Sequence, residues 1–105
     1  MEDLRKEDKE LLKSIEDAGV FRMIKKRLAG VKAPANPFEG MKIKEGREDI
    51  FNRFLETYQG IEKQIWDLIK SIPDFPETIS FRFNLIEDLT RLSMNCIKEM
   101  ALLVE

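Results

Sequence analysis

Seven apolar residues between positions 51 and 72 recur at alternating intervals of three and four residues. This spacing places them on one stripe of an α-helix, as in the seam of a coiled coil. The stripe consists of Phe51, Phe54, Tyr58, Ile61, Ile65, Leu68 and Ile72. Flanking apolar residues widen the arc to about 160°. The sequence therefore predicts a long helix from Glu48 to Ile72 that has to be buried over a broad face.

Two prolines interrupt the chain after this helix, in the segment 72–77. The residue before a proline disfavours the α conformation, so the helix is expected to end near residue 72. Asp74 followed three residues later by Glu77 predicts a capping box. It would open a last helix from about Phe75 to Leu103, rich in leucine and isoleucine. Two long helices joined by a short turn are expected to pack antiparallel.

The N-terminal third of the chain carries a narrower apolar face. Gly19 predicts a stop or kink there, and helical spacing resumes over residues 20–28. Residues 30–46 contain two prolines and three glycines, which predict a connecting loop. Within that loop, Asn36–Glu39 is expected to cap one short helical turn. The sequence thus predicts one broken N-terminal helix followed by a loop.

The predicted fold is all-α, a single domain over residues 1–105. It is an antiparallel bundle of three to four helices, made of two long C-terminal helices and one broken N-terminal helix. Hydrophobic residues make up 43% of the chain and its net charge is −2, which suits a packed core better than disorder. One narrow helix cannot cover two broad apolar arcs. We therefore expect a homo-oligomer, most simply a two-fold dimer.

The chain contains no histidine and a single cysteine, Cys96. This composition excludes Ser–His–Asp and Cys–His catalysis, histidine-based zinc sites and the Glu-x-x-His pairs of di-iron bundles. One cysteine cannot build a cysteine-based metal site, and its helical position predicts an inert core thiol. No glycine-rich phosphate-binding motif is present. We therefore expect no catalytic residue, no metal and no cofactor.

Hydropathy and cysteine content also bear on location. No stretch approaches the roughly 18 uncharged apolar residues of a membrane span. The charged N-terminus is unlike a secretory signal. A single cysteine is typical of a reducing compartment. The sequence predicts a cytoplasmic protein with no membrane partner.

Carboxylates are the remaining candidates for acid–base or metal chemistry. All-α nucleoside triphosphate pyrophosphohydrolases bind Mg²⁺ with paired Glu-x-x-Glu and Glu-x-x-Asp motifs, and the segment from Glu45 to Glu48 resembles the first of them. The second motif is incomplete, because Leu85 stands three residues before Asp88. A degenerate Mg²⁺-dependent pyrophosphohydrolase is therefore an alternative function. It requires Glu45, Glu48 and Asp88 to converge.

Charge is distributed unevenly along the chain. Residues 22–47 carry eight basic and two acidic side chains, a net charge of +6. The segment 11–28 resembles a helix-turn-helix, whose second helix enters the major groove of DNA. The basic side chains of this second helix are Arg22, Lys25, Lys26 and Arg27. Nucleic-acid binding through them is a second alternative, although the helix lacks the usual residues for reading bases.

Six aromatic residues of the two long helices are candidate contacts with a partner. They are Phe51, Phe54, Tyr58, Trp66, Phe81 and Phe83. Aromatic residues at helical spacing are typical of a core or of a dimer interface. The primary prediction is a small non-catalytic module for protein–protein interaction or oligomerisation. The sequence does not identify a partner other than a second copy.

Overall fold

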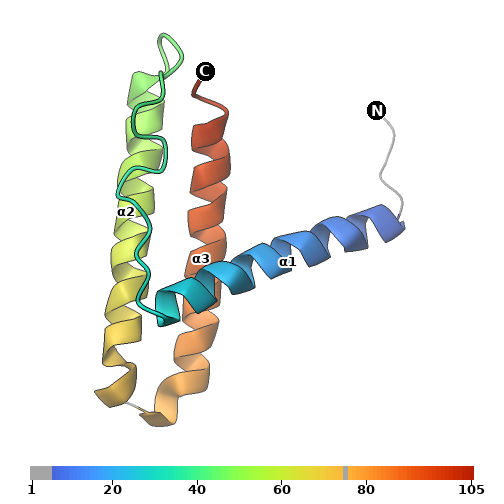
Figure 1. Cartoon of the computed structure of the whole chain (residues 1–105), viewed down its shortest axis with the longest axis vertical. Coiled ribbons are helices and arrows are strands. Elements are labelled where there is room, and N and C mark those ends of the chain that lie inside the picture. Colours follow the sequence, from blue (N-terminus) through green and yellow to red (C-terminus); the bar gives the residue numbers. More distant parts are fainter. Residues whose placement is uncertain (1–5, 75) are drawn as a thin grey trace.

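The computed structural model describes residues 6–74 and 76–105, without the side chains of residues 6–9, 11, 12, 15 and 76. Three helices pack against one another: α1 (Lys6–Leu28), α2 (Glu48–Ser71) and α3 (Ile79–Ala101) (Figure 1). The predicted all-α class is confirmed. Among the described residues, β-structure is limited to one isolated bridge between Ile43 and Val104. None of the described helices has the length and apolar composition needed to cross a bilayer.

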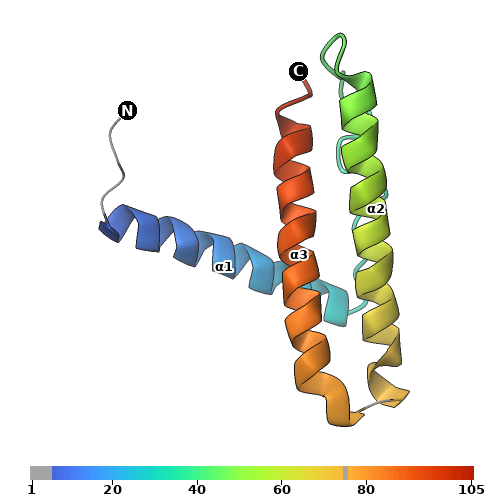
Figure 2. The same ribbon diagram turned by 180° about the vertical axis from the view of Figure 1, so that it is seen from behind.

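The helices α2 and α3 form the predicted antiparallel hairpin and lie side by side (Figures 1 and 2). The helix α2 ends at Ser71, close to the predicted end before Pro73. The predicted stripe supplies its fully buried positions, Phe51, Tyr58 and Ile65. The buried positions of α3 are Ile86, Thr90, Ser93, Cys96 and Met100.

The helix α3 begins at Ile79, later than the sequence predicts. Residues 72–74 and 76–78 form two short 3₁₀ turns, and the N-cap residue Thr78 makes no side-chain cap hydrogen bond. The predicted capping box is therefore wrong. Each proline lacks the N–H that a continuing α-helix needs, which favours short turns here. Phe75, the predicted first residue of this helix, lies outside the described residues.

The helix α1 runs without a break from Lys6 to Leu28, so the predicted interruption at Gly19 is wrong. The helix-turn-helix that depended on this interruption is not formed. Gly19 lies where α1 meets α3, and a Cβ atom on it would be 3.5 Å from Cε of Met94. Glycine inside a helix is destabilising by roughly 0.5–1 kcal/mol relative to alanine, which contacts with α3 can offset.

Replacing Gly19 by alanine tests whether α1 is continuous. A Cβ at 3.5 Å from Met94 makes an ordinary van der Waals contact. We therefore expect the free energy of unfolding to rise by about 0.5–1 kcal/mol, measured by urea denaturation. Gly60→Ala in α2, where a Cβ would meet no atom within 4 Å, is the matched control and should give a similar gain. A loss of stability in Gly19→Ala alone would mean that the chain turns at this residue.

The helix α1 crosses α3 obliquely instead of running alongside the hairpin, and its N-terminal half extends beyond it (Figures 1 and 2). Two ion pairs support the crossing, Asp17 with Arg91 at 2.6 Å and Glu16 with Lys98 at 3.8 Å. The antiparallel arrangement is thus seen for α2 and α3 only.

Residues 30–46 connect α1 to α2 and pass along α2 on the side that α1 occupies (Figure 1). The Oδ1 atom of Asn36 accepts a hydrogen bond of 2.9 Å from the backbone N–H of Phe38, which caps a short turn at the predicted place. The Phe38 ring meets Phe51 edge to face, with ring centres 6.2 Å apart. This loop therefore covers one side of the hairpin core.

Candidate functional site

The side of the hairpin opposite to α1 and the loop has no covering segment among the described residues (Figure 2). Helical periodicity, counted from the buried stripes of α2 and α3, places seven apolar residues toward this side, and two of them, Phe54 and Ile61, also pack against the core. The seven are Ile50, Phe54, Ile61 and Leu68 on α2, and Phe81, Leu85 and Leu92 on α3. We call these seven residues the outer face. Phe81 is 66% exposed, Leu92 51% and Ile50 38%, and the other four are half-buried.

Helix geometry explains why this face remains apolar. The apolar arc of α2 is wider than one neighbouring helix can cover. Apolar residues at one margin of this arc therefore face α3, and those at the other margin face solvent. Thr57, Gln64 and Asp88 are exposed and border the apolar stripes. Soluble monomers rarely expose large contiguous apolar patches, and a patch with a polar margin is typical of an interaction site.

A buried ionic cluster joins all three helices on the opposite side of the hairpin. Arg27 of α1 is only 3% exposed, and its guanidinium makes two contacts with the Glu62 carboxylate of α2, one of them 3.1 Å between Nε and Oε2. Ser93 of α3 donates a hydrogen bond of 2.9 Å to Glu62. Thr90 Oγ1 lies 3.5 Å from Arg27 Nη1. Every buried side-chain nitrogen and oxygen of the described residues has a partner.

This cluster corrects the prediction for the basic segment. Arg22, Lys25 and Lys26 are exposed, as a binding surface requires, but Arg27 is buried. The four side chains therefore do not share one exposed face. Arg27 lies on the side of α1 that meets α2 and α3, where Glu62 neutralises it.

The sequence contains a signal for this cluster in the positions of its polar residues. Glu62 falls inside the apolar arc of α2, one turn after Tyr58, and Thr90 and Ser93 fall on the buried stripe of α3. Polar residues at core-facing positions of two helices predict a buried polar network. The positions of these polar residues do not identify the cation that completes the network.

Tyr58, the only tyrosine, borders the cluster, and its hydroxyl lies 3.4 Å from the Pro34 carbonyl oxygen. Burial, and secondarily the charge of Glu62, raise the pKa of Tyr58 to about 12, although Arg27 opposes the shift. The phenol should therefore stay neutral up to strongly alkaline pH.

This pKa has a measurable consequence. The folded state favours the neutral phenol, so its stabilising contribution is complete below the ordinary pKa of 10.0 and is lost as pH rises toward about 12. We expect the phenolate absorbance of the native protein to appear well above pH 10.0, and that of the guanidinium-unfolded chain near it. A native titration near the ordinary value, with the helical circular dichroism intact, would contradict the burial of Tyr58.

The other candidates for chemistry lie apart. Glu48 opens α2 beside the C-terminal end of α3, whereas Asp88 lies more than three turns before that end, about 20 Å along the axis. The convergence of Glu45, Glu48 and Asp88 that the pyrophosphohydrolase alternative requires is therefore not found. No group of three or more Cys, Asp or Glu residues within the described part of the chain is placed to hold a metal ion. Burial raises the pKa of the Cys96 thiol, as expected for a core group.

The aromatic residues predicted to contact a partner lie in different parts of the structure. Phe51 and Tyr58 are 2% and 1% exposed within the chain itself, so their prediction as interface residues is wrong. The loop 30–46 covers the side of α2 on which they lie. Phe54 and Phe81 belong to the outer face. Phe83 lies on the α1 side of α3 and borders a small hollow there.

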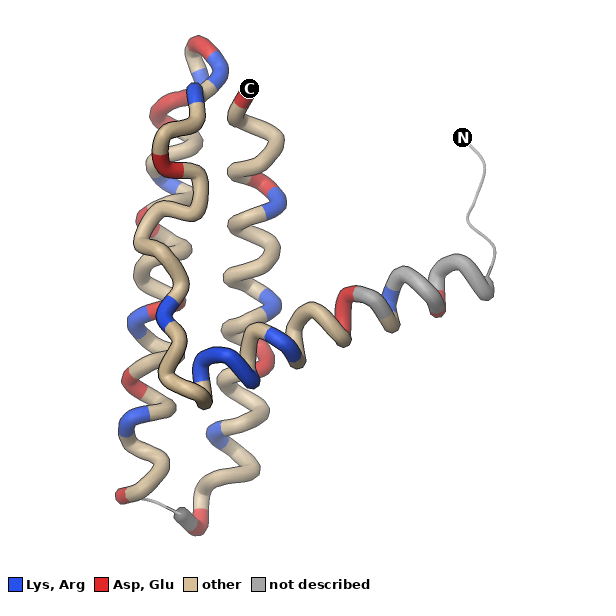
Figure 3. The backbone as a smooth tube through the Cα atoms, in the orientation of Figure 1, with Lys and Arg blue, Asp and Glu red and all other residues tan. Residues whose placement is uncertain are grey.

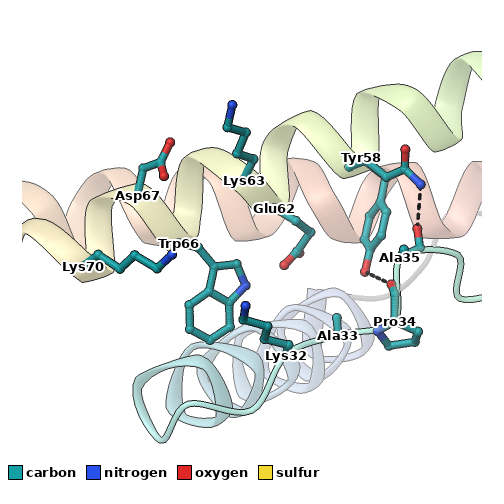
Figure 4. Close-up of a pocket in the computed structure, with 11 residues that line it drawn as sticks. Lys32, Ala33, Pro34, Ala35, Tyr58, Glu62, Lys63, Trp66, Asp67 and Lys70 are labelled. Atoms are coloured by element: carbon teal, nitrogen blue, oxygen red, sulfur yellow. Dashed lines mark hydrogen bonds between the residues drawn. The ribbon is translucent and has the colours of Figure 1, made fainter.

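Trp66, the sixth aromatic candidate, forms a wall of a groove of about 490 Å³ between α2 and the loop (Figure 4). The Nζ atom of Lys32 lies over its ring, 5.8 Å from the ring centre. The loop is held beside α2 by Gln59, whose Nε2 donates a hydrogen bond of 3.0 Å to the carbonyl oxygen of Ala35. Sequence periodicity could not locate this groove, because it depends on where the loop lies.

No family model, curated protein or solved structure matches this chain. Its function is therefore argued from the geometry of its own residues.

Proposed function

We propose that this protein is a non-catalytic interaction module that pairs with a second copy of itself through the outer face. The observation that carries the proposal is the exposure of Phe81 and Leu92 near the half-buried Phe54 and Leu68, on the side of the hairpin that no described segment covers. Burying this surface against an identical surface removes apolar area from water, which is the main driving force of most protein association.

The dimensions of the hairpin support this pairing. The 24 residues of α2 extend about 36 Å. Two adjacent helices are roughly 20 Å wide, given their usual axis separation and diameter. This whole side of the hairpin, with its polar margin, therefore offers a projected area of about 700 Å², comparable to the roughly 800 Å² that each partner buries in a standard stable interface.

A second copy is the partner that we favour, because two hairpins packed face to face complete a four-helix bundle. In a two-fold dimer the same patch serves both copies, so one apolar surface is sufficient. The helix α1 and the loop lie on the other side of the hairpin and leave this approach open (Figures 1 and 2).

The absence of histidine from the sequence and the separation of the candidate carboxylates support a role in binding rather than catalysis. We further propose a cytoplasmic location. The single cysteine, a buried free thiol, suits a reducing compartment.

Sedimentation equilibrium over a range of concentrations tests the proposal. We expect a mass approaching twice the 12.3 kDa of the chain at micromolar concentration, because an interface of this size is typical of stable complexes. A mass of 12.3 kDa at every concentration would rule out self-association.

A further inference from the structure

The groove between α2 and the connecting loop combines an aromatic wall with basic side chains (Figure 4). Lys32 approaches the Trp66 ring from the loop, with Nζ 5.8 Å from the ring centre. Lys70 extends toward the same ring from the next turn of α2, whereas Lys63 and Asp67 extend away from the loop. An aromatic ring and two ammonium groups therefore face one open space.

The positive charge of this groove is not neutralised locally. Its lysines form no ion pair with any residue that the structure describes. They are Lys32, Lys63 and Lys70. Two carboxylates also border the groove, but Glu62 is paired with Arg27. Lys63 and Asp67 extend away from the loop, which leaves Lys32 and Lys70 as the unpaired charges that face the groove among the described lining residues, so the groove favours an anion.

The basic surface continues past the loop. A second hollow of about 310 Å³ lies against the same segment, shares Lys32 with the groove and is also lined by Lys26 of α1. Basic positions at the end of α1, in the loop and in the C-terminal half of α2 lie on neighbouring segments (Figure 3). An anionic chain longer than one charged group can therefore follow this surface.

We infer that the groove binds a nucleotide unit, with its base stacked on Trp66 and its phosphate between Lys32 and Lys70. The stem of Lys32 is long and flexible, so its ammonium can leave the ring for the phosphate as the base arrives. Stacking on an aromatic ring combined with lysine contacts to phosphate is the usual means of binding single strands without sequence preference. The unit is either a free nucleotide or part of a single strand, whose next phosphate reaches Lys26.

This inference is independent of self-association. The groove lies between α2 and the loop, and the loop passes along the side of the hairpin that carries α1, opposite to the outer face (Figures 1 and 2). It also differs from the helix-turn-helix hypothesis, because the ring and two of the lysines belong to α2.

Intrinsic fluorescence tests the inference directly, because Trp66 is the only tryptophan in the chain. The full chain would be titrated with uridine monophosphate, with oligouridylate of about ten nucleotides and with polyglutamate, at about 50 mM salt. We expect saturable quenching by the nucleotides and none by polyglutamate. Tighter binding of the oligomer identifies the source as a single strand, and equal affinities identify it as a free nucleotide.

Variants separate stacking from general attraction to anions. By anisotropy of a labelled oligouridylate, Trp66→Ala should weaken binding by at least about fivefold and Trp66→Phe by less, since phenylalanine still stacks. Replacing Lys32 and Lys70 by glutamine should reduce the slope of log K against log salt by about 1.4. Lys42→Gln, in the part of the loop that lies beside the C-terminus of the chain and outside the groove, is the matched control and should leave affinity unchanged.

Three results would overturn the inference: no saturable quenching by either nucleotide ligand, equal quenching by polyglutamate, or an affinity unaffected by Trp66→Ala. Circular dichroism of each variant shows whether it folds. If Trp66→Ala does not fold, unchanged affinity and salt dependence in the Lys32→Gln, Lys70→Gln double variant would refute the site.

Discussion

Replacing Arg27 by methionine should lower the free energy of unfolding by about 3 kcal/mol, a large part of the stability of a domain this size. The substitution leaves the Glu62 carboxylate, whose side chain is 12% exposed, without its cation. Removing one partner of a buried ion pair is strongly destabilising because the other charge stays in a poorly solvated place. Urea denaturation followed by circular dichroism measures the effect.

Two further variants isolate the ion pair. Lys26→Met changes the exposed neighbouring cation and should alter stability by no more than about 0.5 kcal/mol. Combining Arg27→Met with Glu62→Met should destabilise the protein by about 2 kcal/mol less than the sum of the single effects, because the uncompensated charge is gone. If Arg27→Met behaves like Lys26→Met, the cluster does not join the three helices as described.

Replacing Leu92 by glutamate should raise the dissociation constant of the homodimer by at least about 100-fold. Full burial of a leucine contributes about 1.5–3 kcal/mol, and Leu92 can bury only about half of its side chain on dimerisation. A two-fold interface loses this contribution in both copies and also buries two unpaired glutamates, which adds a desolvation cost. The monomer should fold normally, since Leu92 is 51% exposed in it and glutamate is a good helix former. Sedimentation equilibrium measures the dissociation constant, and thermal unfolding at low concentration checks the monomer.

The matched control for this variant is Leu28→Glu. Leu28 is 45% exposed, similar to Leu92, but it lies at the end of α1, away from the outer face. We expect it to leave dimerisation unchanged. The reverse pattern, in which Leu28→Glu dissociates the dimer and Leu92→Glu does not, would move the interface to the crossing of α1 and α3.

Sequence periodicity predicted the elements whose structure depends on local chemistry. The stripe from Phe51 to Ile72 set the position of α2 to within a residue of its observed end, and Asn36 caps the turn assigned to it. The helix break predicted at Gly19 is wrong because contacts with α3, which is distant in sequence, decide whether α1 continues past a glycine. The predicted start of the last helix is wrong for a local reason, because the two prolines before it favour 3₁₀ turns over the capping box that begins at Asp74.

The sites were less predictable because they depend on contacts between distant segments. Arg27 and Glu62 are 35 positions apart, and nothing near Arg27 distinguishes it from the exposed Lys26. The spacing of Trp66 predicts a candidate contact, but the groove beside its ring depends on the position of a loop that helical periodicity does not determine. The breadth of the apolar arcs, by contrast, led to the expectation of surplus apolar surface, and the outer face provides such a surface.

The central claim, pairing through the outer face, is tested most directly by isotope-filtered nuclear Overhauser spectroscopy on a mixture of labelled and unlabelled copies. We expect intermolecular contacts from Phe81 and Leu92 of α3, and from Phe54 and Leu68 of α2. Intermolecular contacts confined to Phe21 and its neighbours on α1, or none at concentrations where the mass is dimeric, would contradict the account.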